Sequence, residues 1–159
     1  MKVKEVNAES PHGIYLYIPA EDVWMLVAQD GDAFKPSKDG IYITYFDNAK
    51  CPACRKYDKI WFPFVREASR KYNDANFIIV LCDWFARECK SSAASKTFQE
   101  NDIHASPTTV FFMVKDGKKV YEEKYEGVLY EFELKLILEG FKDRAEKSMR
   151  GEKVTPPIS

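Results

Sequence analysis

Residues 42–56 read YITYFDNAKCPACRK, so an unbroken apolar run leads within a few positions to two cysteines spaced three apart. The β-branched and aromatic run 41–46 predicts a strand that is covered on both faces. Residues 52–72 carry apolar side chains at helical spacing, and Pro63 within them is expected to kink or divide the predicted helix. The two cysteines are therefore expected at a junction between a strand and a helix.

This junction favours redox chemistry at the cysteine pair. With Cys51 as N-cap, Pro52 occupies the first helical position, where its missing N–H is no loss. The Cys51 sulfur then faces free backbone N–H groups and the positive end of the helix dipole, which favours its thiolate. Lys50, Arg55 and Lys56 act in the same direction if they lie near the sulfur. Cys54, one turn further on, is shielded but close enough to bridge, as a resolving thiol must be.

The remaining patterns predict one α/β domain over residues 1–150, with a core over 38–145 and a flexible tail over 151–159. Two apolar runs flank the predicted helix and should form parallel strands, and Asp116-Gly117 predicts a hairpin. Helices on both faces of a mixed sheet give a three-layer α/β/α sandwich, with a parallel half and a C-terminal antiparallel hairpin. The further predicted strands are 14–18, 77–82, 108–114 and 118–125. The further predicted helices are 19–31, 91–101 and 129–148. The first strand and first helix of the domain therefore lie at about 14–30.

Composition argues against several classes of function. The chain has 159 residues, with 24 Lys and Arg against 25 Asp and Glu and a net charge of −1, whereas nucleic-acid-binding proteins show a marked basic excess. No apolar run approaches the roughly 18 residues of a membrane-spanning helix. The first residues, MKVKEVNAESPHG, lack the apolar centre of a secretory signal. We therefore expect a cytoplasmic protein that binds neither nucleic acid nor membrane.

Four cysteines leave three interpretations open. A close pair in a cytosolic chain is more often catalytic or metal-binding than structural. A zinc or iron–sulfur site would draw on Cys51, Cys54, Cys82 and Cys89, but six residues separate the second pair and the two histidines add no metal-binding pattern. We therefore expect no metal. Cys82 is read as a small buried hydrophobe, and the spacing leaves open whether it forms a second, regulatory or stabilising disulfide with Cys89.

Three segments together resemble the thioredoxin family. They are the segment 42–56, FIIVLCD at 77–83, which ends in an acidic residue, and NDIHASPTTVFFMVKDGKKV at 101–120. The resemblance spans about residues 38–145. It implies a thioredoxin fold, with Cys51 as the attacking nucleophile and Cys54 as the resolving thiol.

The resemblance also implies how a substrate is bound. Pro107 would be a cis-proline facing the disulfide, where a trans proline at a strand start is the alternative. The backbone of Ser106 would pair with an extended substrate strand, and Pro52 and Ala53 would give apolar contacts. The implied partners are proteins with disulfides or dithiols and a redox partner resembling thioredoxin reductase. No metal or organic cofactor is implied.

The sequence departs from the thioredoxin pattern beside the cysteines. Lys50 replaces a tryptophan, and the inner dipeptide Pro-Ala is closer to the Cys-Pro-x-Cys pattern of glutaredoxins and oxidases, which predicts a redox potential above that of a strong reductant. Tyr45 replaces the buried aspartate six residues before the first cysteine. Asp47, Tyr45 or water must then accept the proton of the resolving thiol, so Lys50, Asp47 and Tyr45 are the residues expected to tune the pair.

The sequence thus predicts a cytoplasmic thiol–disulfide oxidoreductase that acts on proteins through Cys51 and Cys54. A different class of function is the alternative: a thioredoxin-fold binding or adaptor module, in which the cysteines are regulatory or incidental. The zinc or iron–sulfur site is the third hypothesis.

Overall fold

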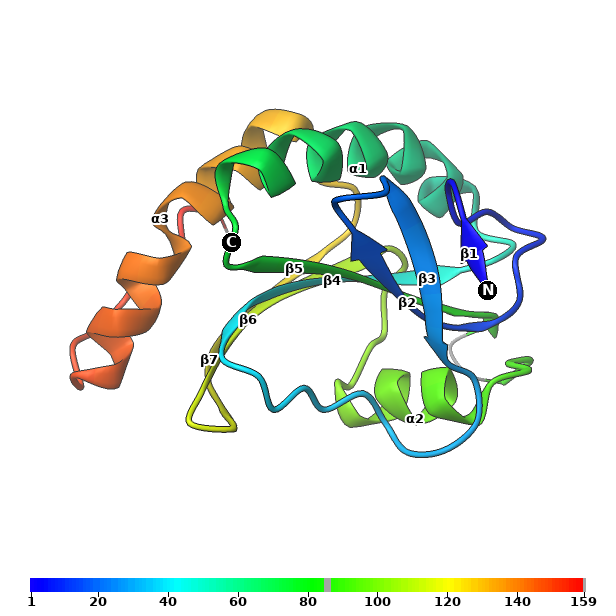
Figure 1. The fold of residues 1–159 in the computed structure, drawn as a ribbon. Coiled ribbons are helices and arrows are strands. Elements are labelled where there is room, and N and C mark those ends of the chain that lie inside the picture. The colour runs from blue at the N-terminus through cyan, green and yellow to red at the C-terminus, as the bar shows by residue number, and fades with distance from the viewer. Residues whose placement is uncertain (85–86, 159) are drawn as a thin grey trace.

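A seven-stranded mixed sheet lies between helices in the computed structural model, which describes residues 1–84 and 87–158. Helices α1 and α3 cover one face of the sheet and α2 covers the other (Figure 1). The three-layer α/β/α prediction is confirmed. In chain order the elements are β1 (Lys2–Val3), β2 (Gly13–Ile18), β3 (Val23–Ala28), β4 (Gly40–Asn48), α1 (Pro52–Lys71), β5 (Ala75–Cys82), α2 (Ser92–Glu100), β6 (Thr108–Lys115), β7 (Lys118–Glu126) and α3 (Glu131–Met149).

The predicted helix over 19–31 is wrong, because the chain forms the strand β3 there. Backbone hydrogen bonds from Glu21 to Ile18 and from Asp22 to Pro19 close a turn after β2. Asp22 takes a positive φ of 51°, a conformation that aspartate tolerates better than most residues. The residues after this turn include β-branched and aromatic side chains, which favour a strand. Trp24 among them is buried against the core. A Pro and two acids, which favour a helix start, here make a hairpin.

The predicted parallel half of the sheet reduces to one pair of strands. The sheet order is β1-β3-β2-β5-β4-β6-β7, and among the described strands β4 and β5 alone pair in parallel. Strand β2 pairs antiparallel with β5, as Gly13 opposite Leu81 shows. Because a hairpin replaces the predicted N-terminal helix, β2 lacks the crossover connection that would have brought a parallel neighbour.

Helix α1 continues through Pro63, so of the two predicted outcomes, a kink or a division, the division is wrong. Proline removes the N–H that would bond to the carbonyl of Lys59. Both Pro63 and Lys59 are exposed, so water can hydrate that carbonyl while the inner face of the helix stays packed. The long helix keeps its first turn, with Cys51 and Cys54, at the end of β4.

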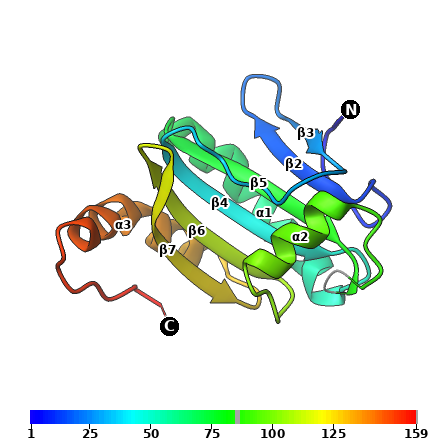
Figure 2. The same ribbon diagram turned by 90° about the horizontal axis from the view of Figure 1, so that it is seen from below.

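The sheet separates two hydrophobic clusters. The larger lies under α1 and α3 and contains Trp24, Tyr45, Trp61 and Cys54. The smaller lies under α2, which crosses the opposite face of β4 and β5 (Figure 2). Near the end of the described chain, Ile158 packs against the larger cluster. No helix among the described residues is long and apolar enough to cross a membrane.

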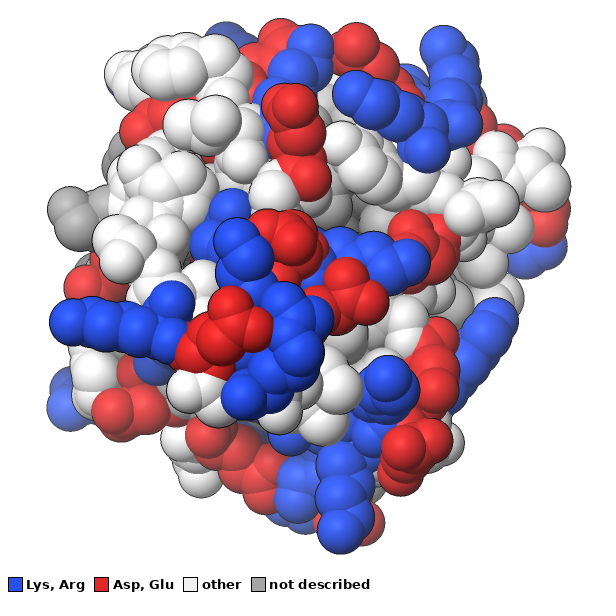
Figure 3. Space-filling model, turned by 90° about the vertical axis from the view of Figure 1, so that its left-hand side faces the viewer, with Lys and Arg blue, Asp and Glu red and all other residues white. Residues whose placement is uncertain are grey.

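Charges of both signs alternate on the surface around α3 and the β6–β7 hairpin (Figure 3). Many of these charges form ion pairs. Examples are Lys135 with Glu131 at 2.9 Å, Lys147 with Asp143 at 3.1 Å and Lys119 with Glu122 at 2.6 Å. Among the described residues, this face therefore carries positive and negative charges close together.

Candidate active site

Cys51 is the N-cap residue of α1 and Pro52 opens the helix, as the sequence predicts. The backbone of Cys51 is extended, and its sulfur accepts a hydrogen bond from the Cys54 N–H at 3.2 Å. Cys51 is half-buried, whereas Cys54 is fully buried, and both are free thiols. The first sulfur can be reached from solvent and the second lies behind it.

The Ser106–Pro107 segment lies against both sulfurs. The peptide bond between the two residues is cis. The Cys51 thiol lies 3.6 Å from the Ser106 carbonyl oxygen, and the Cys54 Sγ lies 2.8 Å from the Ser106 hydroxyl. Pro107 is buried, Ser106 is half-buried, and Pro52 is exposed on the first turn of α1 beside half-buried Ala53. Sequence reasoning assigned only the backbone of Ser106 to this site and missed its hydroxyl.

Asp47, at the end of β4, is a buried carboxyl group below the first turn of α1. Its Oδ1 accepts a hydrogen bond from Arg55 at 2.6 Å, and within residues 1–84 and 87–158 its Oδ2 has no hydrogen-bond partner. Burial raises the pKa of Asp47 to about 7, despite the attraction of the Arg55 guanidinium. Burial and the charge of Asp47 both raise the pKa of Cys54, and the Ser106 hydroxyl opposes them.

Tyr45 is fully buried in the cluster under α1. Its hydroxyl lies 2.9 Å from the Cys54 carbonyl oxygen and 2.8 Å from Asp58 Oδ1. Burial raises its pKa well above the ordinary value, so the hydroxyl stays protonated and serves as a donor. The contacts of Tyr45 therefore fix the first turn of α1, and of the two residues considered as proton acceptors Asp47 is the better placed.

Arg55 and Asp58, both half-buried, complete the polar cluster around Asp47, and sequence reasoning missed this role. Arg55 Nε donates to Asp58 Oδ2 at 2.9 Å, and another nitrogen of the same guanidinium donates to the carbonyl of Ala49. The spacing of the two residues, three apart on the predicted helix, was the available signal. It could not show that Asp47 would lie within reach of the same guanidinium.

Lys50 directs its charge toward the segment after β5. Its ammonium lies 3.6 Å from Asp83 Oδ2 and 4.0 Å from Glu88 Oε2. The lysine is exposed, whereas Asp83 is buried. These two ion pairs of Lys50 link the loop before Cys51 to the β5–α2 connection.

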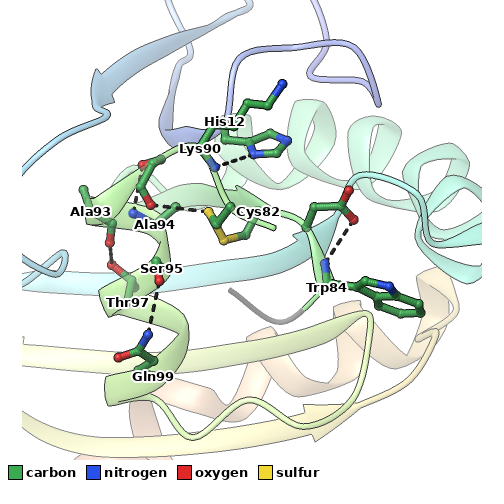
Figure 4. Close-up of a disulfide and its surroundings, with 12 residues drawn as sticks. His12, Cys82, Trp84, Lys90, Ala93, Ala94, Ser95, Thr97 and Gln99 are labelled. Atoms are coloured by element: carbon green, nitrogen blue, oxygen red, sulfur yellow. Dashed lines mark hydrogen bonds between the residues drawn. A yellow bond between two sulfur atoms is a disulfide. The ribbon is translucent and has the colours of Figure 1, made fainter. Parts of the chain in front are cut away.

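Cys82 and Cys89 form a disulfide on the other face of the sheet (Figure 4). Cys82 ends β5 opposite Asn48 of β4 and is fully buried in the cluster under α2. Beside it, the His12 Nδ1 accepts the backbone N–H of Lys90 at 3.0 Å, and burial lowers the pKa of His12. The disulfide removes two of the four thiolates that a four-cysteine metal site would need.

Comparison with solved structures identifies the fold. A thioredoxin from Aeropyrum pernix superposes with a TM-score of 0.53 at 17% identity, covering 86% of this chain and 96% of its own. A chloroplastic thioredoxin z superposes with a TM-score of 0.52 at 14% identity, covering 75% of this chain and 97% of its own. No protein-family model and no curated protein matches the sequence. The chain has the thioredoxin fold, with a cysteine pair at the start of α1.

Proposed function

We propose that the protein is a thiol–disulfide oxidoreductase that exchanges disulfides with protein substrates through Cys51 and Cys54. One observation carries the proposal: a reachable sulfur is the N-cap of α1 and accepts the Cys54 N–H, while a second thiol is buried behind it. Backbone N–H groups at a helix start stabilise negative charge that develops on such a sulfur.

The reaction proceeds in two exchanges. The Cys51 thiolate attacks one sulfur of a substrate disulfide, forms a mixed disulfide and expels the other substrate sulfur as a thiolate. Cys54 then loses its proton and attacks the Cys51 sulfur of the mixed disulfide, which releases the second substrate thiolate. The substrate disulfide gains two electrons, and Cys51 and Cys54 end as a disulfide. In reverse, the same steps oxidise a substrate dithiol.

Asp47 is the proposed acceptor of the Cys54 proton. The raised pKa of Cys54 keeps this thiol protonated until the second exchange, so a base must take the proton. Asp47 is buried close to Cys54 and has an oxygen without a hydrogen-bond partner in the described part of the chain. With a pKa of about 7, its carboxyl is partly ionised at neutral pH and becomes fully ionised above it.

Substrates and partners are part of the same proposal. An extended substrate strand would pair with the Ser106 backbone next to Cys51, and Pro52 and Ala53 would contact it. A cytoplasmic redox partner resembling thioredoxin reductase would recharge the pair, and no cofactor is required. The direction of exchange is set by the redox potential of the pair: about −270 mV implies a reductant, and above about −200 mV implies an oxidase or isomerase.

Reduction of insulin in the presence of dithiothreitol tests the proposal. We expect Cys51→Ser to lower turnover by at least about a hundredfold, because the attacking sulfur is lost. The matched control is the double variant Cys82→Ala/Cys89→Ala, which should keep turnover close to that of the wild type. Equal turnover in the wild type and Cys51→Ser would refute the oxidoreductase and leave the binding or adaptor module as the better description.

A further inference from the structure

A half-buried arginine joins three groups beneath the cysteine pair, and the two-exchange mechanism does not account for it. Arg55 follows Cys54 directly on α1 and lies 2.6 Å from Asp47 Oδ1 and 2.9 Å from Asp58 Oδ2. It also donates to the Ala49 carbonyl. The Asp47 side chain is 1% exposed, so this ion pair is shielded from solvent on the side of the carboxylate.

We propose that Arg55 is a positioning residue for the resolving step: it binds one oxygen of Asp47 and thereby leaves the other oxygen open to the Cys54 proton. The inference rests on the proposed function, since it names the residue that prepares the proton acceptor. It assigns Arg55 no contact with the substrate and no contact with either reacting sulfur.

The first support is the asymmetry of the Asp47 carboxyl. Oδ1 is occupied by the guanidinium, whereas Oδ2 is buried and has no hydrogen-bond partner among the described residues. A buried carboxylate oxygen without a donor is costly, so stable proteins rarely leave one unsatisfied without a reason. The free lone pairs of Oδ2 provide the capacity to accept a proton. Cys54, a buried thiol that must lose one, is the nearby donor.

The second support is the way the guanidinium is itself held. Arg55 Nε is fixed by Asp58, and Asp58 in turn lies 2.8 Å from the Tyr45 hydroxyl through its other oxygen. The Ala49 carbonyl fixes a further nitrogen. A planar guanidinium can serve these directions at once, whereas an ammonium cannot. The position therefore requires the shape of arginine as well as its charge.

The third support is the balance of charge around Asp47. The groups that face it are Arg55, Asp58 and Cys54 of α1 and Tyr45 of its own strand. The guanidinium opposes both the burial of Asp47 and the negative charge of Asp58. Without it the carboxyl would hold its proton to a higher pH, and the base form would be scarce at neutrality.

Rapid mixing of the reduced protein with Ellman's reagent, a small aromatic disulfide, separates the two steps. Each step releases one coloured thiolate: the first comes from attack by Cys51 and the second from resolution by Cys54. In the wild type we expect the rate of the second phase to rise with pH around 7. In Arg55→Gln this rise should move by about one pH unit or more to alkaline pH, so that the second phase is at least about fivefold slower at pH 7 and about tenfold slower at pH 6. The first phase should be unchanged.

Three further variants sharpen the measurement. Arg55→Lys keeps the charge and is the variant least prone to misfold; we expect an intermediate shift. Asp47→Asn should make the second phase slow at every pH. Arg66→Gln is the matched control, because Arg66 lies on the same helix but pairs with Glu5 and Asp22. It should leave both phases as they are in the wild type.

NMR titration of the Asp47 side-chain carboxyl carbon gives a readout that does not depend on turnover, and its midpoint should be higher in Arg55→Gln than in the wild type. An unchanged midpoint together with an unchanged second phase would overturn the role of Arg55. A wild-type protein that releases neither thiolate would overturn the proposed function instead. The two failures are therefore distinguishable.

Discussion

The two cysteine pairs lie at the same end of neighbouring strands but on opposite faces of the sheet. Cys51 and Cys54 follow β4 and belong to the cluster under α1, whereas Cys82 ends β5 and belongs with Cys89 to the cluster under α2. The first pair consists of free thiols and the second is a disulfide. Because the sheet lies between them, we expect each pair to react independently of the other.

The surroundings of the two pairs differ in polarity. Cys54 contacts the Ser106 hydroxyl and has Asp47 nearby, so its thiol lies among groups that can give and take protons. Cys82 is fully buried with Ala93 and Ala94 of α2 in an apolar cluster, and the sulfur of its partner Cys89 lies 3.3 Å from the backbone carbonyl of Ser91. We therefore attribute the reactivity proposed for the first pair to the polar groups beneath its thiols more than to its sequence spacing.

The largest expected effect concerns the buried carboxyl under the first pair. The folded-state pKa of Asp47, about 7, lies above its ordinary value of 3.8, so the folded protein binds this proton more tightly than the unfolded chain. The contribution of Asp47 to stability is then present below pH 3.8 and lost as pH rises through 7, by up to about 4 kcal/mol. The free energy of unfolding of Asp47→Asn should show no such fall with rising pH. Urea denaturation at several pH values would measure this difference from the wild type.

A surface variant controls for general effects of charge in that series. Asp143 on α3 is largely exposed, so Asp143→Asn should follow the pH dependence of the wild type. If Asp47→Asn lost stability between pH 4 and pH 8 as steeply as the wild type, Asp47 would not be the buried group that titrates near neutrality.

The next effect concerns the second pair. Its cysteines are 7 residues apart in sequence, and closing so short a loop should stabilise the fold by about 2.5 kcal/mol through the entropy of the unfolded chain. Cys82→Ala/Cys89→Ala should lower the free energy of unfolding by about this amount and spare insulin reduction. Loss of turnover in a variant shown to be folded would mean that the two pairs do not act separately.

A smaller effect is expected at the contact between Ser106 and Cys54. The Ser106 hydroxyl lies 2.8 Å from the Cys54 sulfur and lowers the pKa of that thiol. Ser106→Ala removes one hydrogen bond of about 1 kcal/mol, so the second phase with Ellman's reagent should slow by about fivefold. The first phase serves as the internal control. A slower first phase with an unaltered second phase would show that the hydroxyl acts on Cys51 and not on Cys54.

The smallest effect is expected at Lys50, whose ion pairs connect the loop before Cys51 to the β5–α2 connection, which carries Cys89. Lys50 is exposed, so Lys50→Ala should change the free energy of unfolding by only about 0.3 kcal/mol at low salt and less at high salt. Urea denaturation at two ionic strengths would measure this change. A loss above about 1 kcal/mol would show that Lys50 holds the β5–α2 connection against the first pair.

Apolar runs and local motifs predicted most of the central fold. Strands β4, β5 and β6, helix α1 and the N-cap role of Cys51 follow from patterns within a few residues. The N-terminal region did not follow, because Pro19 and the acids after it suit either a helix start or a turn, and the pairing of β3 with β2 decides between them. Tertiary pairing outweighed local preference there.

The sequence likewise predicted one part of the candidate site, the cysteine pair, and not the contacts of the polar groups beneath it. The spacing of Cys51 and Cys54 indicated which sulfur would be reachable. That Asp47 shares a guanidinium with Asp58 depends on how β4 and α1 pack against each other, which no local pattern records. The second disulfide was likewise left open, because seven residues of separation are compatible with a bond or with two thiols.

Trapping of the mixed disulfide tests the central claim, that Cys51 is the attacking sulfur, most directly. Cys54→Ser removes the resolving thiol, so incubation with insulin should leave insulin attached to the protein. Peptide mapping under non-reducing conditions should then locate the bond at Cys51, with Cys82 and Cys89 still joined to each other. An adduct at Cys82 or Cys89, or no adduct with a folded protein, would contradict the account.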